Sequence, residues 1–221
     1  MKIKVIACEV MKEEIQAIEG LDDLDFEFVS MDFHLYPKKL KTELQRIIDQ
    51  SRGYDKIILA FGLCGGAANG LKATNCELVI PRVHDCISIF LCPKNGCVCD
   101  FKKEIGTFYL SNGWMITEKS ILSDYQRILQ KFGPQKANKI LNRMYDGYKK
   151  ILFIETGGVR QDEVIRQSKE IAELFKAEYE TIQGQSAFIE KIISGPWDEE
   201  NFITVAAQGI ITEEDFGINA K

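Results

Sequence analysis

Four residues that bind metals well each stand just after a short apolar run that reads as a buried strand: Cys8, Cys64, His84 and Cys86. Parallel strands bring their carboxyl ends to one edge of a sheet, where open α/β sheets bind their ligands. Thiolate sulfur and imidazole nitrogen are the donors that zinc, cobalt and iron prefer. The sequence therefore predicts a metal site formed by these residues, with zinc as the first choice and iron as another.

Two carboxylates accompany these ligands. Glu9 follows Cys8, and Asp85 lies between His84 and Cys86. A ligating imidazole usually donates its second N–H to a carboxylate, and a carboxylate can also carry a proton during a reaction. We therefore expect Glu9 and Asp85 to support the ligands or to act as catalytic acid–base groups.

The same residues allow two other interpretations. Without a metal, Cys64 would be a nucleophile and His84 its base. Cysteine also serves as a small buried hydrophobic residue at strand ends, which is the simplest account of any one of these thiols. Three thiols at three strand ends favour a functional site over packing alone.

The loop around Cys64 reads Gly62-Leu63-Cys64-Gly65-Gly66 and directly follows an apolar strand. Cys64 thus lies where the backbone needs the conformational freedom of glycine. The loop matches neither the Walker pattern nor the dinucleotide fingerprint. A helix beginning after it would present N–H groups to an anion, so Gly62, Gly65 and Gly66 are candidates for binding a cofactor.

A second group of thiols comprises Cys92, Cys97 and Cys99, with Cys76 nearby. Its C-x4-C-x-C spacing is neither that of a zinc ribbon nor that of a ferredoxin. The ligand type suits an iron–sulfur cluster and the spacing does not, so a surface loop with redox-active thiols is the alternative. Seven cysteines, an odd count, suggest thiols in a reducing compartment rather than structural disulfides.

Composition restricts the partners. The chain has 221 residues, 45% hydrophobic and 28% charged, with a net charge of −5. Nucleic-acid binding requires a basic face, and no cluster of Lys and Arg stands out. There is no signal peptide, and no apolar run approaches the roughly 18 residues of a membrane span. These features predict a cytoplasmic protein that binds a small molecule, without nucleic-acid or membrane partners.

Apolar strands alternate with helices along the chain, which is the pattern of a parallel sheet covered by helices. The clearest helix begins at Pro37 and places Leu40, Leu44, Ile47 and Ile48 on one face. Strands are expected at 4–7, 26–31, 56–61, 77–80, 107–110, 151–155, 179–182 and 202–205. Further helices are expected near 85–91, with Asp85 as N-cap, and near 121–132, 137–148, 162–175 and 188–193. A turn is expected at 113–114.

This order predicts an α/β protein with a mostly parallel sheet and helices on both faces, a Rossmann-like arrangement of two βα halves plus a helical hairpin. We expect a single domain over 1–221, or two halves at 1–116 and 151–221 joined by the hairpin at 117–150. Strands that end in glycine, at Gly62 and Gly157, suggest that the halves are related. An exposed hairpin commonly forms a dimer contact, so a homodimer is compatible with this pattern.

Several segments together resemble the DUF1638 family, an uncharacterised domain of methanogenic archaea and anaerobic bacteria. They are Ala7-Cys8-Glu9, the Phe-Gly-Leu-Cys-Gly loop at 61–65, the segment Ile-Pro-Arg-Val-His-Asp-Cys at 80–86, and Gly113-Trp114. The resemblance covers nearly the whole chain and does not include the loop from Cys92 to Cys99.

The resemblance implies a link to corrinoid-dependent methyltransferase systems and one-carbon metabolism, since family members are described beside them. It makes a corrinoid a further candidate cofactor and a corrinoid methyltransferase system a candidate partner. One concrete version is zinc that activates a substrate thiol for methyl transfer. A non-catalytic accessory protein that binds a small ligand or a methyltransferase is the alternative, so whether the chain is an enzyme stays open.

Overall fold

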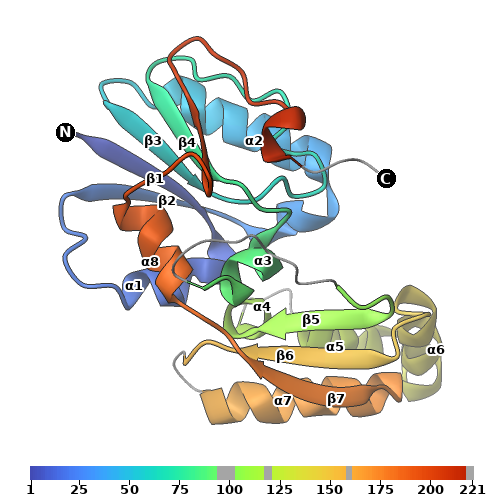
Figure 1. The fold of residues 1–221 in the computed structure, drawn as a ribbon. Coiled ribbons are helices and arrows are strands. Elements are labelled where there is room, and N and C mark those ends of the chain that lie inside the picture. The colour runs from blue at the N-terminus through green and yellow to red at the C-terminus, as the bar shows by residue number, and fades with distance from the viewer. Residues whose placement is uncertain (94–102, 117–120, 158–160, 218–221) are drawn as a thin grey trace. The chain divides into compact units, whose positions relative to one another are not determined.

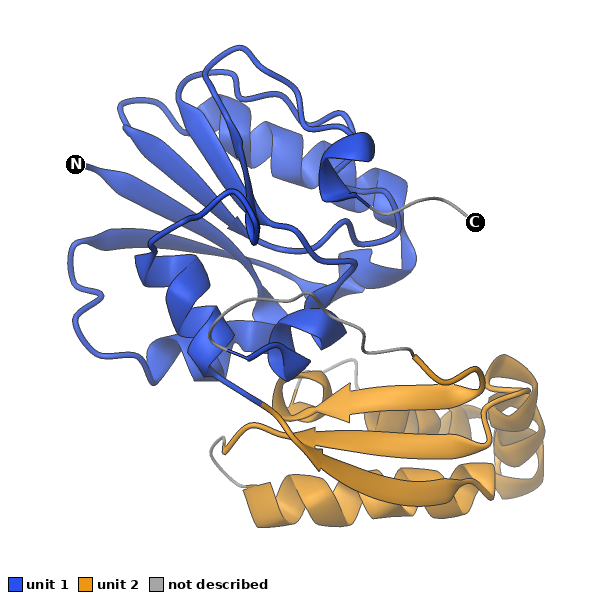
Figure 2. Ribbon diagram, in the orientation of Figure 1, with its two compact units in different colours: residues 1–101, 185–221 blue, residues 102–184 orange. Residues whose placement is uncertain are grey.

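The structure is a computed structural model that describes residues 1–93, 103–116, 121–157 and 161–217. The chain divides into two compact units (Figure 2). Unit 1 comprises Met1–Phe101 and Gln185–Lys221, and unit 2 comprises Lys102–Gly184, so unit 2 is inserted between two segments of unit 1. The helical hairpin expected at 117–150 lies within unit 2, and the division differs from the two expected halves.

Unit 1 contains a five-stranded sheet with the order β2-β1-β3-β4-β8 (Figure 1). The strands are β1 (Ile3–Cys8), β2 (Leu24–Val29), β3 (Lys56–Ala60), β4 (Glu77–Pro81) and β8 (Phe202–Val205). The first four are parallel, as predicted, whereas β8 pairs antiparallel with β4. The sheet is therefore mixed but mostly parallel, as expected, whereas the Rossmann-like arrangement of two halves is not confirmed.

The strand order reverses between β1 and β3. The chain passes from β1 outward to β2 on one side and then returns to β3 on the other side of β1. At such a point the connections leave the sheet in opposite directions, and a crevice opens at the carboxyl ends of the two strands. The end of β1 is Cys8, and the loop with Cys64 follows β3.

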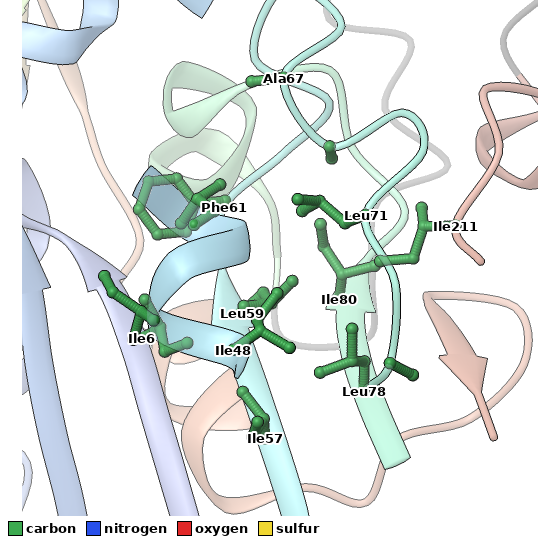
Figure 3. Packing of buried hydrophobic residues seen from close by; sticks show 14 of the residues in the cluster. Ile6, Ile48, Ile57, Leu59, Phe61, Ala67, Leu71, Leu78, Ile80 and Ile211 are labelled. Carbon is green, nitrogen blue, oxygen red and sulfur yellow. The ribbon is translucent and has the colours of Figure 1, made fainter. Parts of the chain in front are cut away.

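Helix α2 (Pro37–Gln50) covers one face of this sheet. Pro37 occupies the first turn, where its missing N–H has no helical partner to lose. The helix buries the four residues that the sequence pattern placed on one face, Leu40, Leu44, Ile47 and Ile48. They pack in a core with apolar side chains of β1, β3, β4 and the C-terminal segment, among them Ile6, Ile57, Leu59, Phe61, Leu78, Ile80 and Ile211 (Figure 3). Full burial of each such side chain contributes about 1.5–3 kcal/mol.

Two helices cover the opposite face. Helix α1 (Lys12–Gln16) packs against α8 (Ala187–Ser194), and α8 packs against β3 and α3 (Cys86–Leu91). Helix α8 buries Phe188, Ile189 and Ile192 completely. Short 3-10 helices complete the unit: η1 (Glu9–Met11), η2 (Met31–Leu35) and η3 (Glu214–Phe216). Helices thus lie on both faces of this sheet, as the alternating pattern predicted.

Unit 2 contains a parallel three-stranded sheet in the order β5-β6-β7 (Figure 1). Its strands are β5 (Thr107–Ser111), β6 (Lys150–Glu155) and β7 (Glu178–Gln183), and its helices are α4 (Asn112–Ile116), α5 (Ile121–Phe132), α6 (Pro134–Met144) and α7 (Gln161–Phe175). Leu110, Ile121, Leu141, Phe153 and Ile171 form its core. Gly113 and Trp114, expected in a turn, lie in α4 instead, because Met115 of that helix is buried in the same core.

Within the described ranges, no helix combines the length and the apolar character that crossing a bilayer would require.

Candidate functional site

A pocket of about 210 Å³ opens at the carboxyl edge of the sheet of unit 1. Residues at or after the ends of β1, β2, β3 and β4 line it together with the start of α2: Cys8, Ser30, Met31, His34, Pro37, Leu40, Phe61, Cys64, Gly65, Asp85 and Cys86. Because β1 and β3 both contribute, the pocket lies where the strand order reverses. Its volume is below the roughly 300–1,000 Å³ of pockets for drug-sized ligands, so it suits a small molecule.

Three of the four predicted metal ligands line this pocket, namely Cys8, Cys64 and Cys86. His84 does not line it, and its residue is exposed. In the part of the chain that the structure describes, no group of three or more His, Cys, Asp or Glu side chains is arranged to hold a metal ion. The strand-end argument thus brings the three thiols to one pocket, and metal binding by them stays a prediction.

Cys64 has a backbone conformation that is uncommon for a residue with a side chain. Its φ of 47° is in the left-handed region, as the glycine-like position in the loop predicted. For an L-residue this costs about 1–2 kcal/mol. Hydrogen bonds to the loop after β4 hold the conformation: Leu63 N–H donates to the Val83 carbonyl at 2.9 Å, and Cys64 N–H donates to the His84 carbonyl at 2.8 Å. A strained residue fixed in this way at a pocket is typical of a functional position.

Gly62 permits the close approach of these two loops. A Cβ atom at this position would lie 2.5 Å from Asp85 N and 2.7 Å from the carbonyl carbon of His84. Gly65 has a φ of 66°, and its Cβ would be 3.0 Å from Cγ of Pro37. The glycines therefore allow close packing around Cys64.

Residues 67–73, after the glycine loop, contain turns and a bridge residue and no helix. No helix N-terminus begins there to attract an anion. Cofactor binding by the backbone of Gly62, Gly65 and Gly66 stays a prediction. Its support in the structure is that Gly65 lines the pocket.

Asp85 is the N-cap of α3, as predicted. Its Oδ1 accepts hydrogen bonds from the Ser88 N–H at 3.2 Å and from the Ser88 hydroxyl at 3.4 Å. This places Cys86 in the first turn of the helix, beside the pocket. The carboxylate therefore has a structural role, which must be separated experimentally from any role in proton transfer.

We expect Asp85→Ala to lower the free energy of unfolding by about 1 kcal/mol, because the Ser88 N–H loses its acceptor. Asp85→Ser is the matched control, since a serine hydroxyl caps a helix about as well and carries no charge. Urea unfolding should find the serine variant close to the wild type. If both variants lost the same free energy of unfolding, the carboxylate would not stabilise the protein by capping the helix.

Glu9 lies in η1 and does not line the pocket. Its Oε2 accepts a hydrogen bond from the Met31 N–H at 3.2 Å, so it anchors the segment after β2. At the start of the same segment, Ser30 Oγ accepts the Asp32 N–H at 3.3 Å and caps η2. The two side chains together fix the segment that carries His34.

Burial raises the pKa of the Cys8 thiol from 9.0 to about 11, and the neighbouring Glu9 charge acts in the same direction. The folded protein therefore holds this proton more tightly than the unfolded chain does. The stability associated with it is complete below pH 9 and is lost as the pH rises towards 11, by about 3 kcal/mol in total.

The measurement is urea unfolding of wild type and Cys8→Ala between pH 8 and 11. We expect the stability difference between the two proteins to change over this range in favour of the variant, which has no thiol to ionise. A difference that is independent of pH would contradict the raised pKa of the Cys8 thiol.

His34 is the pocket residue that the sequence analysis missed. It follows the end of β2 by five residues, but it lies within η2 and not directly at the strand end. Of the other cysteines, Cys76 is a buried thiol and does not line the pocket. Cys92 is buried and disulfide-bonded, contrary to the expectation that all seven are thiols. Cys97 and Cys99 lie outside the described residues.

Comparison with known proteins identifies one family. The family model described as "Protein of unknown function (DUF1638)" matches residues 28–193, which include every residue of the pocket lining except Cys8. No curated protein and no solved structure matches the chain. The matched region covers well over half of the sequence and includes parts of both units. The chain therefore belongs to the DUF1638 family.

Proposed function

We propose that unit 1 binds a small electrophilic molecule in this pocket and that Cys64 attacks it as a nucleophile. The observation that carries the proposal is the left-handed backbone of Cys64 at the pocket wall. In α/β-hydrolases a nucleophile with glycine two positions before and after it sits on a strained turn between a strand and a helix; here the strand and the strained turn are present and no helix follows. Gly62 and Gly66 stand at these positions around Cys64.

Differences among the three thiols favour Cys64. Burial holds the Cys8 pKa near 11, which keeps that thiol protonated at neutral pH. Cys86 is 5% exposed and belongs to the first turn of α3. Cys64 is partly buried, as Cys8 is, but lies in a loop whose conformation is fixed by the hydrogen bonds described above. Reactive cysteines are typically accessible in this way, whereas buried ones are inert.

The pocket limits the substrate to a small group. Its volume of about 210 Å³ is smaller than that of pockets for drug-sized ligands. Leu40 and Phe61 supply apolar wall, and His34 and Asp85 supply polar groups. A short acyl or alkyl compound fits this combination. In the reaction, the Cys64 thiolate forms a bond to an electrophilic carbon, and the leaving group departs with its electron pair.

A thiol-bound metal is the second candidate; Cys8, Cys64 and Cys86 line one pocket, which favours it, but their side chains are not arranged as a metal site in this structure and would have to move to bind one. Thiolate ligands suit zinc, and a zinc ion there would activate a substrate thiol for methyl transfer. Binding would require the thiols to ionise, and so it would release protons. This candidate predicts near-stoichiometric metal that is lost in Cys64→Ala.

The test of the proposal is alkylation of the full chain by iodoacetamide at neutral pH, with each cysteine followed by peptide mass spectrometry. We expect one rapid modification, at Cys64, and no rapid modification in Cys64→Ala. Metal content is measured on the same anaerobically purified preparations. Slow modification of every thiol in the metal-free protein would refute the nucleophile, and metal that depends on Cys64 would favour the second candidate.

A further inference from the structure

The chain contains two histidines, His34 and His84, and their places differ. Both histidines are exposed, but His34 lines the pocket with Cys64 and His84 does not. We propose that His34, and not His84, accepts the proton of the Cys64 thiol. This inference rests on the proposed nucleophilic function of Cys64 and adds a base that strand position alone did not identify.

The segment with His34 is held in place on both sides of the histidine. Before it, Ser30 caps η2, and the Glu9 carboxylate accepts the Met31 N–H. After it, the chain enters α2 at Pro37, whose ring fixes the backbone at the first helical turn. A general base must be held in position relative to its nucleophile. These contacts fix the backbone of the segment that contains His34.

The loop with Cys64 packs directly against this segment. Gly65 leaves room for Pro37, since a Cβ at Gly65 would lie 3.0 Å from Cγ of the proline ring. Gly65 follows Cys64 in the chain, and Pro37 comes three residues after His34. The nucleophile loop and the histidine segment are therefore neighbours, and both His34 and Cys64 line the pocket.

The contacts of His84 that shape the Cys64 loop come from its backbone. Its carbonyl oxygen accepts the Cys64 N–H at 2.8 Å, and its carbonyl carbon lies close to Gly62. These contacts hold the loop in shape and would be the same for another residue at position 84. The imidazole is not needed for them.

The proton balance of the step is simple. The S–H bond of Cys64 breaks, its proton passes to a neutral imidazole nitrogen of His34, and the electron pair stays on sulfur. The thiolate then bonds to the electrophilic carbon, and the departing group can take the proton back from the imidazolium. The other ionisable groups that face the pocket are Cys8, Asp85 and Cys86, and Asp32 lies on the histidine segment.

The test compares His34→Gln with the matched variant His84→Gln in the full chain, with iodoacetamide as the probe. At about pH 7 a thiol without a base is only a few per cent ionised, so we expect His34→Gln to react about tenfold more slowly at Cys64. At about pH 10 hydroxide ionises accessible thiols, and the difference should disappear. His84→Gln should react within about twofold of the wild type at both pH values. Imidazole added to His34→Ala should restore part of the rate at pH 7.

Each outcome decides between the histidines. A neutral-pH loss in His84→Gln alone, or a wild-type profile in His34→Gln, overturns the inference while the reactivity of wild-type Cys64 still supports the proposed function. Slow alkylation of Cys64 in the wild type itself refutes the proposed function, and the inference with it. A loss in His34→Gln that persists at pH 10 and is not rescued by imidazole shows a structural role and also overturns the inference.

A second measurement needs no variant. Two imidazoles give two sets of ring signals in a proton NMR titration of the wild type. Carbamidomethylation of Cys64 should change the titration of the pocket histidine, His34, and leave that of His84 as it was. A change confined to His84 would overturn the inference. Single-histidine variants, checked for folding by circular dichroism, assign the signals.

Discussion

Gly62→Ala should destabilise unit 1 by about 3 kcal/mol, the upper part of the range for overpacking a well-packed site. The added methyl would lie 2.5 Å from Asp85 N and 2.7 Å from Asp85 Cα, and both are backbone atoms that cannot rotate away. Separating the two loops would also weaken the hydrogen bond from Cys64 N–H to the His84 carbonyl. We therefore expect alkylation of Cys64 to slow at least tenfold, together with the loss of stability in urea unfolding.

Gly66→Ala is the matched control four residues away in the same loop. Its φ is 88°, and a Cβ there meets nothing within 4 Å, so the substitution adds backbone strain without a clash. The expected cost is about 1–2 kcal/mol. A Gly62→Ala variant that is as stable as Gly66→Ala would contradict the close approach of the loops.

Substitutions at Cys64 should separate stability from reactivity. Glycine adopts the left-handed region freely, whereas alanine retains the strain of a side chain at a φ of 47°. We expect Cys64→Gly to be more stable than Cys64→Ala by about 1 kcal/mol, and both to lose the rapid alkylation completely. Urea unfolding and peptide mass spectrometry of the two variants measure these effects.

Thr42, exposed in the middle of α2, supplies the reference pair. In a right-handed helix the order is reversed, and Thr42→Gly should be less stable than Thr42→Ala by about 1 kcal/mol. If alanine were also the more stable residue at position 64, the backbone of Cys64 would not be left-handed in solution.

Local patterns predicted the elements that place the site. The apolar stripe of Leu40, Leu44 and Ile48 requires α2 in its observed position, because a helix with that face must cover the sheet. Asp85 before an apolar run predicted the start of α3. Strand ends predicted that Cys8, Cys64 and Cys86 would reach one edge, since parallel strands share their carboxyl end.

Features that depend on distant contacts did not follow from these patterns. The apolar run of β8 is compatible with either strand direction, and its antiparallel pairing with β4 depends on how the chain returns after unit 2. The position of a residue at a strand end likewise does not determine where its side chain points. Asp85 and Cys86 line the pocket, whereas the adjacent His84 does not. His34 was missed because contacts from Glu9 and Ser30 place its segment.

The most direct test of the account is the rate constant for carbamidomethylation of Cys64 in the native wild-type chain, divided by its rate constant in the same chain unfolded in urea at neutral pH. Packing alone makes a thiol slower when folded, whereas a site that presents and activates it makes it faster. We predict a ratio of about ten or more for Cys64, with Cys76 and Cys86 below one in the same sample. A ratio below one for Cys64 as well would contradict the account and make it a packing residue like its neighbours.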